Sequence, residues 1–73
     1  MLNIGEFTYI EEEDQYFAEA TFNGIEFAIS VDLNESAVLI LKSRDVSLSE
    51  MQKHIVPYSD HIIAIVAIYF DMI

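Results

Sequence analysis

Cysteine and tryptophan are absent from this chain of 73 residues, and glycine and proline together contribute only three residues. Without cysteine there is no disulfide and no thiolate metal site, and nothing ties the chain to an oxidising compartment. The scarcity of glycine and proline leaves no candidate linker, so we expect residues 1–73 to form a single domain. A domain this short buries only about 60% of its unfolded surface, so its stability is marginal. Because disulfides and thiolate metal sites are excluded, oligomerisation is the remaining way to add stability.

Basic side chains are almost as scarce: three Lys and Arg stand against 13 Asp and Glu, giving a formal charge of −10. The first 41 residues hold nine acidic side chains and no Lys or Arg. Because nucleic acids and anionic membranes attract cationic proteins, we expect this chain to bind neither directly. The negative electrostatic potential of such a chain favours a basic protein as partner. The competing interpretation is that the acidity only keeps an apolar chain dissolved.

Long hydrophobic runs are also missing. The longest nearly uncharged stretch, residues 62–70, has nine residues, and a membrane-spanning helix needs roughly 20. The first six residues contain no basic side chain ahead of an apolar run, so we expect no signal peptide and a cytoplasmic location.

The clearest pattern that is present is an alternation of apolar and polar residues on both sides of Asn23-Gly24. Both residues tolerate the positive φ of a two-residue type I′ turn, so segments 16–22 and 25–31 are predicted to form a hairpin. The short loop sets the register and places eight side chains on the core face. The expected pairs are Phe22 with Ile25, Ala20 with Phe27, Ala18 with Ile29, and Tyr16 with Val31.

Two further segments of strand character flank this hairpin. Residues 6–10 precede it across the acidic turn Glu11–Asp14, and residues 37–42 follow it as a continuous apolar run. The predicted fold class is α+β, with an antiparallel β-meander of three to four strands (about 6–10, 16–22, 25–31 and 37–42) before C-terminal helices.

The helical half begins at Ser47, where apolar residues start to recur at spacings of three and four. The stripe comprises Leu48, Met51, Ile55, Tyr58, Ile62, Ile65, Tyr69 and Met72. Ser47 and Glu50 have the spacing of a capping box, which marks the start of a helix.

Pro57 interrupts the stripe, since proline removes one intrahelical hydrogen bond. We therefore predict one kinked or two separate helices, about 47–56 and 59–72, with Ser59 as the second cap. Residues 62–70 are rich in β-branched side chains, so a buried strand is the alternative there.

The second helix would be apolar around most of its circumference, apart from a narrow stripe formed by Asp60, Ala64, Ala67 and Asp71. One face of a small sheet cannot cover such a helix, so we expect a homo-oligomer, most simply a dimer. The expected interface residues are Ile62, Ile65, Val66, Tyr69 and Phe70.

No arrangement typical of an enzyme is present. Glu50 and His54, four residues apart, could share a helix face and offer two metal ligands, and His61 lies seven residues after His54. A pair of ligands is not a site, because zinc requires a third and usually a fourth ligand. The run Glu11–Asp14 lacks the spacing of a calcium-binding EF-hand loop. We therefore expect no catalytic residues, no metal and no cofactor.

The stretch from Phe7-Thr8-Tyr9 through Asn23-Gly24-Ile25 to Val31 combines a short aromatic strand, an acidic turn and a hairpin over Asn-Gly. It resembles small uncharacterised bacterial domains often found among toxin-immunity-like proteins. The resemblance covers about half of the chain. It implies a non-enzymatic binding protein, of bacterial or phage type, and transfers no functional residue.

Together these features predict a small acidic protein that inhibits or sequesters a basic, nucleic-acid-handling protein by electrostatic and steric occlusion. The residues expected to contact the partner are Glu11, Glu12, Glu13, Asp14, Glu19 and Glu26. The alternative is a homo-oligomerising structural module driven by the apolar C-terminal helix, in which acidity only solubilises.

Overall fold

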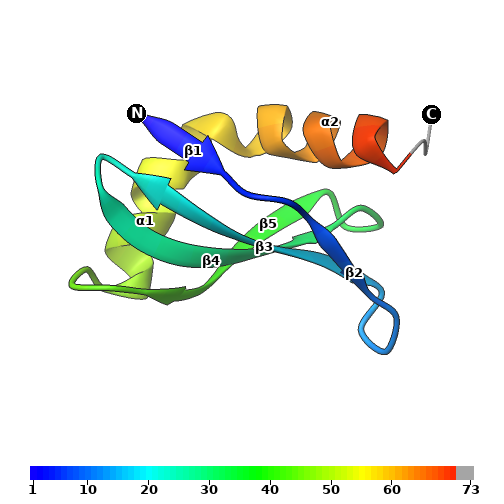
Figure 1. Ribbon diagram of the computed structural model, residues 1–73, viewed down its shortest axis with the longest axis horizontal. Helices are drawn as coiled ribbons and strands as arrows, with labels where there is room; N and C mark the ends of the chain where they lie inside the picture. Colours follow the sequence, from blue (N-terminus) through cyan, green and yellow to red (C-terminus); the bar gives the residue numbers. More distant parts are fainter. Residues whose placement is uncertain (71–73) are drawn as a thin grey trace.

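The computed structural model describes residues 1–70, which form a five-stranded antiparallel sheet followed by helices on one of its faces (Figure 1). The elements are β1 (Leu2–Ile4), β2 (Thr8–Ile10), β3 (Gln15–Phe22), β4 (Ile25–Asp32), β5 (Ala37–Ser43), α1 (Leu48–Ile55), the 3₁₀ turn η1 (Val56–Tyr58) and α2 (Ser59–Tyr69). Strands β1, β3, β4 and β5 are neighbours in that order, and β2 also pairs with β3. The α+β prediction is confirmed, with one strand more than expected.

The central hairpin has the predicted register. Asn23 and Gly24 both have positive φ, at 51° and 84°, as the two-residue turn requires. Phe22 pairs with Ile25, and Tyr16 at the far end of β3 pairs with Val31. Local turn chemistry therefore determines the centre of the sheet.

Strands β1 and β2 are two halves of one edge strand, separated by a bulge that the sequence pattern did not predict. From the Ile4–Ala20 pair to the Thr8–Phe17 pair, the edge strand advances four residues while β3 advances three. At the bulge the Gly5 amide donates to the Glu19 carbonyl at 2.8 Å, and a Cβ on Gly5 would lie only 3.1 Å from that oxygen. The bulge turns Phe7 into the core. The strand predicted at 6–10 therefore begins too early and omits β1, because a bulge breaks the period-two pattern.

The opposite edge of the sheet, β5, is protected by a side chain of α1. Gln52 Nε2 donates to the Val38 carbonyl at 3.1 Å, and the Ile40 amide donates to Gln52 Oε1 at 3.3 Å. This carboxamide takes the place that a peptide group of another strand would occupy. Edge strands left unpaired are sites of aggregation, so Gln52 both satisfies the backbone and blocks further pairing.

Replacing Gln52 with alanine is expected to lower the free energy of unfolding by about 1–3 kcal/mol, because two backbone groups lose their partners. Urea denaturation measures this change, and light scattering measures the expected increase in aggregation. Lys53→Ala, at the next position of the same helix, is the control and should change little. Equal stability of the two variants would contradict the role of Gln52.

Helix α1 begins as predicted, and α2 begins at the predicted residue but without the predicted cap. The Ser47 hydroxyl accepts from the Glu50 amide at 3.2 Å. Ser59, the predicted second cap, instead lies inside the helix: its amide donates to the Val56 carbonyl through η1, and Tyr58 precedes α2 without a side-chain cap. Pro57 falls in the first turn of η1, where no amide is needed, so the chain bends without an interruption that would require a new cap.

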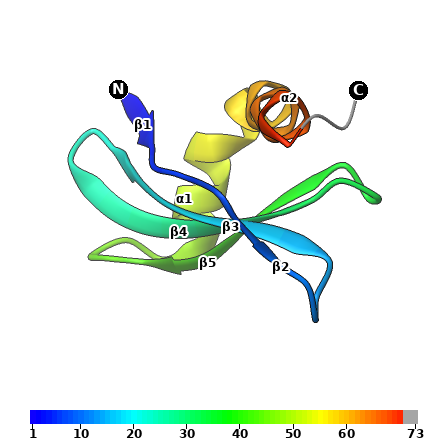
Figure 2. The same cartoon turned by 45° about the vertical axis from the view of Figure 1, so that its right-hand side comes forward.

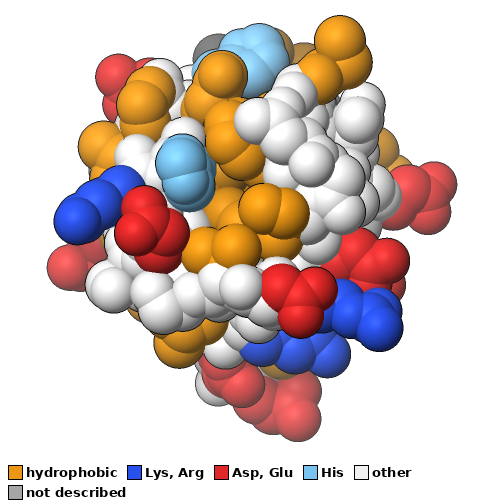
Figure 3. Space-filling view, turned by 90° about the vertical axis from the view of Figure 1, so that its left-hand side faces the viewer, with side chains coloured by type: hydrophobic (Ala, Val, Ile, Leu, Met, Phe, Trp, Pro, Cys, Tyr) orange, Lys and Arg blue, Asp and Glu red, His pale blue; other side chains and the backbone are white. Residues whose placement is uncertain are grey.

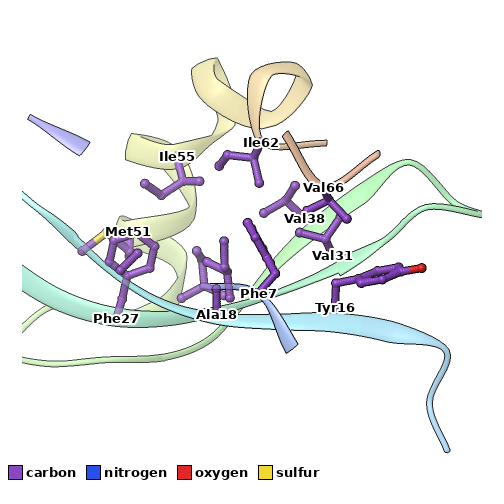
Figure 4. Close-up of a cluster of buried hydrophobic side chains, with 13 residues drawn as sticks. Phe7, Tyr16, Ala18, Phe27, Val31, Val38, Met51, Ile55, Ile62 and Val66 are labelled. Atoms are coloured by element: carbon purple, nitrogen blue, oxygen red, sulfur yellow. The ribbon is translucent and has the colours of Figure 1, made fainter. Parts of the chain in front are cut away.

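Helices α1 and α2 pack on the same face of the sheet, and their buried side chains meet the inner face of β3, β4 and β5 (Figures 2 and 4). The largest fully buried side chains are Ile29, Val31, Met51, Ile55, Ile62 and Val66. Residues 62–69 are helical, so the strand alternative is wrong. Within the predicted stripe, Leu48 and Tyr69 are about half exposed, whereas Val66, outside the stripe, is fully buried. Met72 and Asp71 lie outside the described residues.

Candidate functional site: the acidic end

Two turns gather acidic side chains at one end of the sheet. The β2–β3 turn (11–14) and the β4–β5 turn (33–36) lie at the same end (right in Figure 1), because alternate reversals of a meander return to one side. We call this the acidic end; it comprises Glu11, Glu12, Glu13, Asp14, Asp32 and Glu35. The three Lys and Arg residues lie towards the opposite end, at the end of β5 (Lys42), just after it (Arg44) and in α1 (Lys53). Hence no cationic side chain interrupts the acidic end.

Hydrogen bonds join the two turns of the acidic end. Asn34 Nδ2 donates to Asp14 Oδ2 at 2.9 Å, and the Tyr9 hydroxyl donates to Asp14 Oδ1 at 2.7 Å. Asp32 Oδ1 accepts the amides of Asn34 at 2.9 Å and Glu35 at 3.2 Å. Asp14 and Asp32 therefore hold the turns in shape.

The remaining four carboxylates of the acidic end have no such internal role. Within residues 1–70, the side chains of Glu11, Glu12, Glu13 and Glu35 make no hydrogen bond or ion pair, and all four residues are exposed. They remain available to a partner.

The pKa of the Tyr9 hydroxyl depends on its hydrogen bond to Asp14 and therefore shows whether the β2–β3 turn is formed. Its hydrogen bond to Asp14, with smaller contributions from desolvation and from the carboxylate charge, raises the pKa of Tyr9 to about 12. A phenol whose folded-state pKa is raised adds stability that is fully present below its unfolded pKa of about 10 and is lost as the pH rises towards 12.

Asp14→Asn should therefore bring the titration of Tyr9 down towards pH 10, because the charged acceptor is lost. Ultraviolet difference titration of tyrosinate, with Tyr9→Phe to identify the signal, measures the shift. Asp32→Asn is the matched control, since Asp32 accepts from the amides of Asn34 and Glu35 and does not contribute to the raised pKa of Tyr9. A titration that Asp14→Asn leaves unchanged would mean that the Tyr9–Asp14 contact does not form in solution.

Two of the predicted contact residues, Glu19 and Glu26, lie elsewhere, on the outer face of the sheet. Glu26 Oε1 is 3.4 Å from Arg44 Nη1, and both side chains are mostly exposed. Glu19 pairs across the sheet with Ala28, whose other neighbour is Lys42. This face forms a shallow groove of about 740 Å³ lined by two acidic and two basic side chains. It is therefore a face of mixed charge, and Glu19 and Glu26 are not part of the acidic end.

Asp32 and Glu35 complete the acidic end but were absent from the sequence prediction. A usable signal existed: in a four-stranded meander the connection after the third strand returns to the side of the connection after the first. The predicted strand order therefore already implied that residues 32–36 lie near 11–14.

The five residues expected at an oligomer interface have different environments. Ile62 and Val66 are fully buried in the core of the chain, so neither side chain is available to a second copy. Ile65 and Phe70 are partly buried against that core, and the ring of Phe70 lies 4.6 Å from that of Tyr16. Only Tyr69, 58% exposed, is largely open. Contact with the chain's own sheet therefore covers Ile62 and Val66, whereas Ile68 and Tyr69 on the other side of α2 stay exposed.

The three residues considered as metal ligands, Glu50, His54 and His61, do not lie together in one site. His54 Nε2 lies 3.7 Å from Glu50 Oε2, whereas His61 is on α2 and lines a separate groove beside β1. Among residues 1–70, no group of three His, Asp or Glu side chains could hold a metal ion. In the same part of the chain, no helix is long and apolar enough to span a bilayer.

Comparison with family models, curated proteins and solved structures finds no match to this chain. Function is therefore inferred from its own charge and geometry.

Proposed function

We propose that this chain binds a basic protein through its acidic end and thereby inhibits or sequesters a nucleic-acid-handling factor. The observation that carries the proposal is the segregation of charge: six carboxylates surround two adjoining turns, and all Lys and Arg side chains lie elsewhere. Proteins that bind nucleic acids present Lys and Arg to phosphates. A cluster of carboxylates can occupy the same positions and block access.

The geometry of the acidic end suits such binding. Asp14, Asn34 and Asp32 hold the turns before a partner arrives, so less conformational entropy is lost on association. The unpaired Glu11, Glu12, Glu13 and Glu35 repel one another, and a cationic surface relieves that repulsion. The protein acts by binding and occlusion, with no chemical step.

Neutralising the four available carboxylates is the direct test. We expect Glu11→Gln, Glu12→Gln, Glu13→Gln and Glu35→Gln together to weaken binding of a lysine-rich peptide by about tenfold to a hundredfold, at 0.2–1 kcal/mol for each exposed ion pair. Isothermal titration at several salt concentrations measures the affinity, and the variant should also show a shallower salt dependence.

A control variant with the same net charge neutralises four acids outside the acidic end. It combines Glu6→Gln, Glu19→Gln, Glu50→Gln and Asp60→Asn, and it should retain most of the affinity. Equal losses in both variants would show that only total charge matters, which is the solubilising interpretation. Capture from a lysate of the host should return basic proteins that salt elutes; partners that resist salt would contradict the electrostatic mechanism.

A further inference from the structure

The end of the molecule opposite the acidic end carries an apolar patch. The ring of Phe22 lies 5.4 Å from that of His54 and 6.1 Å from that of Tyr58, and Ile25 pairs with Phe22 across the hairpin. We call these four residues the Phe22 patch. Tyr58 is 38% exposed, and Phe22 and Ile25 are only partly buried. Figure 3, which views this end, shows hydrophobic side chains gathered at its centre with charged side chains around them.

Acidic and basic side chains are equal in number around the Phe22 patch, unlike in the whole chain. The nearby ends of β4 and β5, the β5–α1 connection and α1 carry three basic and three acidic side chains. These are Lys42, Arg44 and Lys53, and Glu26, Asp45 and Glu50. A chain with a formal charge of −10 repels its own copies, so this end, which has no excess of acidic side chains, is where two copies meet with least repulsion.

We infer that the Phe22 patch is the contact surface for a second copy of this chain, in a symmetric dimer. Self-complementarity favours a copy over a foreign partner, because both signs of charge flank the patch on two sides: Glu50 and Lys53 on α1, and the Glu26–Arg44 pair beside the hairpin. A twofold axis in the plane of contact can place the α1 side of one copy against the hairpin side of the other, so that each acid faces a base.

The dimensions of the chain agree with this arrangement. A standard interface buries about 800 Å² on each partner, which is one-sixth of the 4873 Å² surface of the chain. The longest dimension of one copy is 34 Å, whereas the screening length at physiological salt is about 8 Å. With the patches in contact, the two acidic ends point in opposite directions and do not repel each other.

This arrangement is independent of the proposed function but would affect it. A dimer of this kind presents two acidic ends at opposite poles. It could bind two basic partners, or two sites on one large partner, and gain avidity from the second contact.

Sedimentation equilibrium on two charge-matched variants tests the inference. Tyr58→Glu adds one negative charge within the patch, and Ile68→Glu adds the same charge on the exposed side of α2, where Ile68 is 69% exposed. We expect the wild type and Ile68→Glu to sediment as dimers, at twice the 8.4 kDa chain mass. Tyr58→Glu should sediment as a monomer, with dimer affinity reduced at least tenfold.

Circular dichroism establishes whether Tyr58→Glu keeps its fold. If it does not, Lys53→Glu replaces it, because Lys53 is exposed and makes no ion pair within residues 1–70. A folded Lys53→Glu should also lose the dimer, since it places unbalanced negative charge at the contact of both copies. A monomeric wild type overturns the inference, as does a dimer that Ile68→Glu dissolves and the patch variants leave intact.

Discussion

Replacing Ile62 with aspartate is expected to unfold the chain at room temperature. Ile62 is completely buried on α2, in the same cluster as Ile55 and Val66 (Figure 4). Truncating such a side chain costs about 2–5 kcal/mol, and an unpaired buried carboxylate costs several kcal/mol more. A domain of this length has a total stability of roughly 4–11 kcal/mol, at about 0.05–0.15 kcal/mol for each residue. Thermal unfolding followed by circular dichroism should show no cooperative transition.

Ile68→Asp is the matched control for this substitution. It makes the same chemical change on the same helix, at a side chain that is mostly exposed. Its free energy of unfolding should stay within about 0.5 kcal/mol of the wild type. A folded Ile62→Asp variant, or an equal loss of unfolding free energy in both variants, would contradict the assignment of the Ile62 side of α2 as the side that faces the sheet.

Truncating Phe7 to alanine should produce the second-largest loss, about 3–5 kcal/mol of unfolding free energy. Phe7 is 7% exposed and belongs to the main core although it lies in the break between β1 and β2. The cost is large because the bulge positions this ring over the inner face of the sheet, and alanine would leave a cavity there. Urea denaturation at equilibrium measures the change.

Phe17→Ala provides the comparison, because it removes the same ring from the outer face of β3, where Phe17 is only partly buried. We expect it to lose less than about 2 kcal/mol, since less apolar surface is removed from contact. If Phe17→Ala were the more costly change, the outer face would have to be covered in solution, and the bulge would not have the structural role assigned to it.

Features that depend on residues close together in the sequence could be predicted, whereas features that depend on contacts between distant segments could not. The hairpin was predictable because Asn23-Gly24 determines both turn type and register within a few residues. The start of α1 was predictable because Ser47 and Glu50 are three residues apart. The division of the edge strand was not, because the bulge depends on the Gly5 contact with Glu19 on another strand.

The orientation of α2 also could not be predicted from residues close together in the sequence. Its composition indicated a helix with too little polar surface, and excess apolar surface suggested a partner chain. In the structure, packing against the sheet buries Ile62 and Val66, and that depends on the angle at which the chain leaves Pro57 and η1. Periodicity defines a stripe on a helix but not the neighbour that covers it.

By itself, the sequence determined the net charge, the absence of disulfides, the α+β class and the central hairpin, since each depends on composition or on residues close together in the chain. The strand order of the meander already implied that residues 32–36 lie near 11–14, but only the tertiary structure decided the individual contacts there and the place of the other carboxylates. It joined Asp14 to Asn34 across 20 residues, separated Glu19 and Glu26 from the acidic turns, and placed Gln52 on the open edge of β5. These arrangements depend on contacts between distant segments, which form only when the whole sheet is assembled.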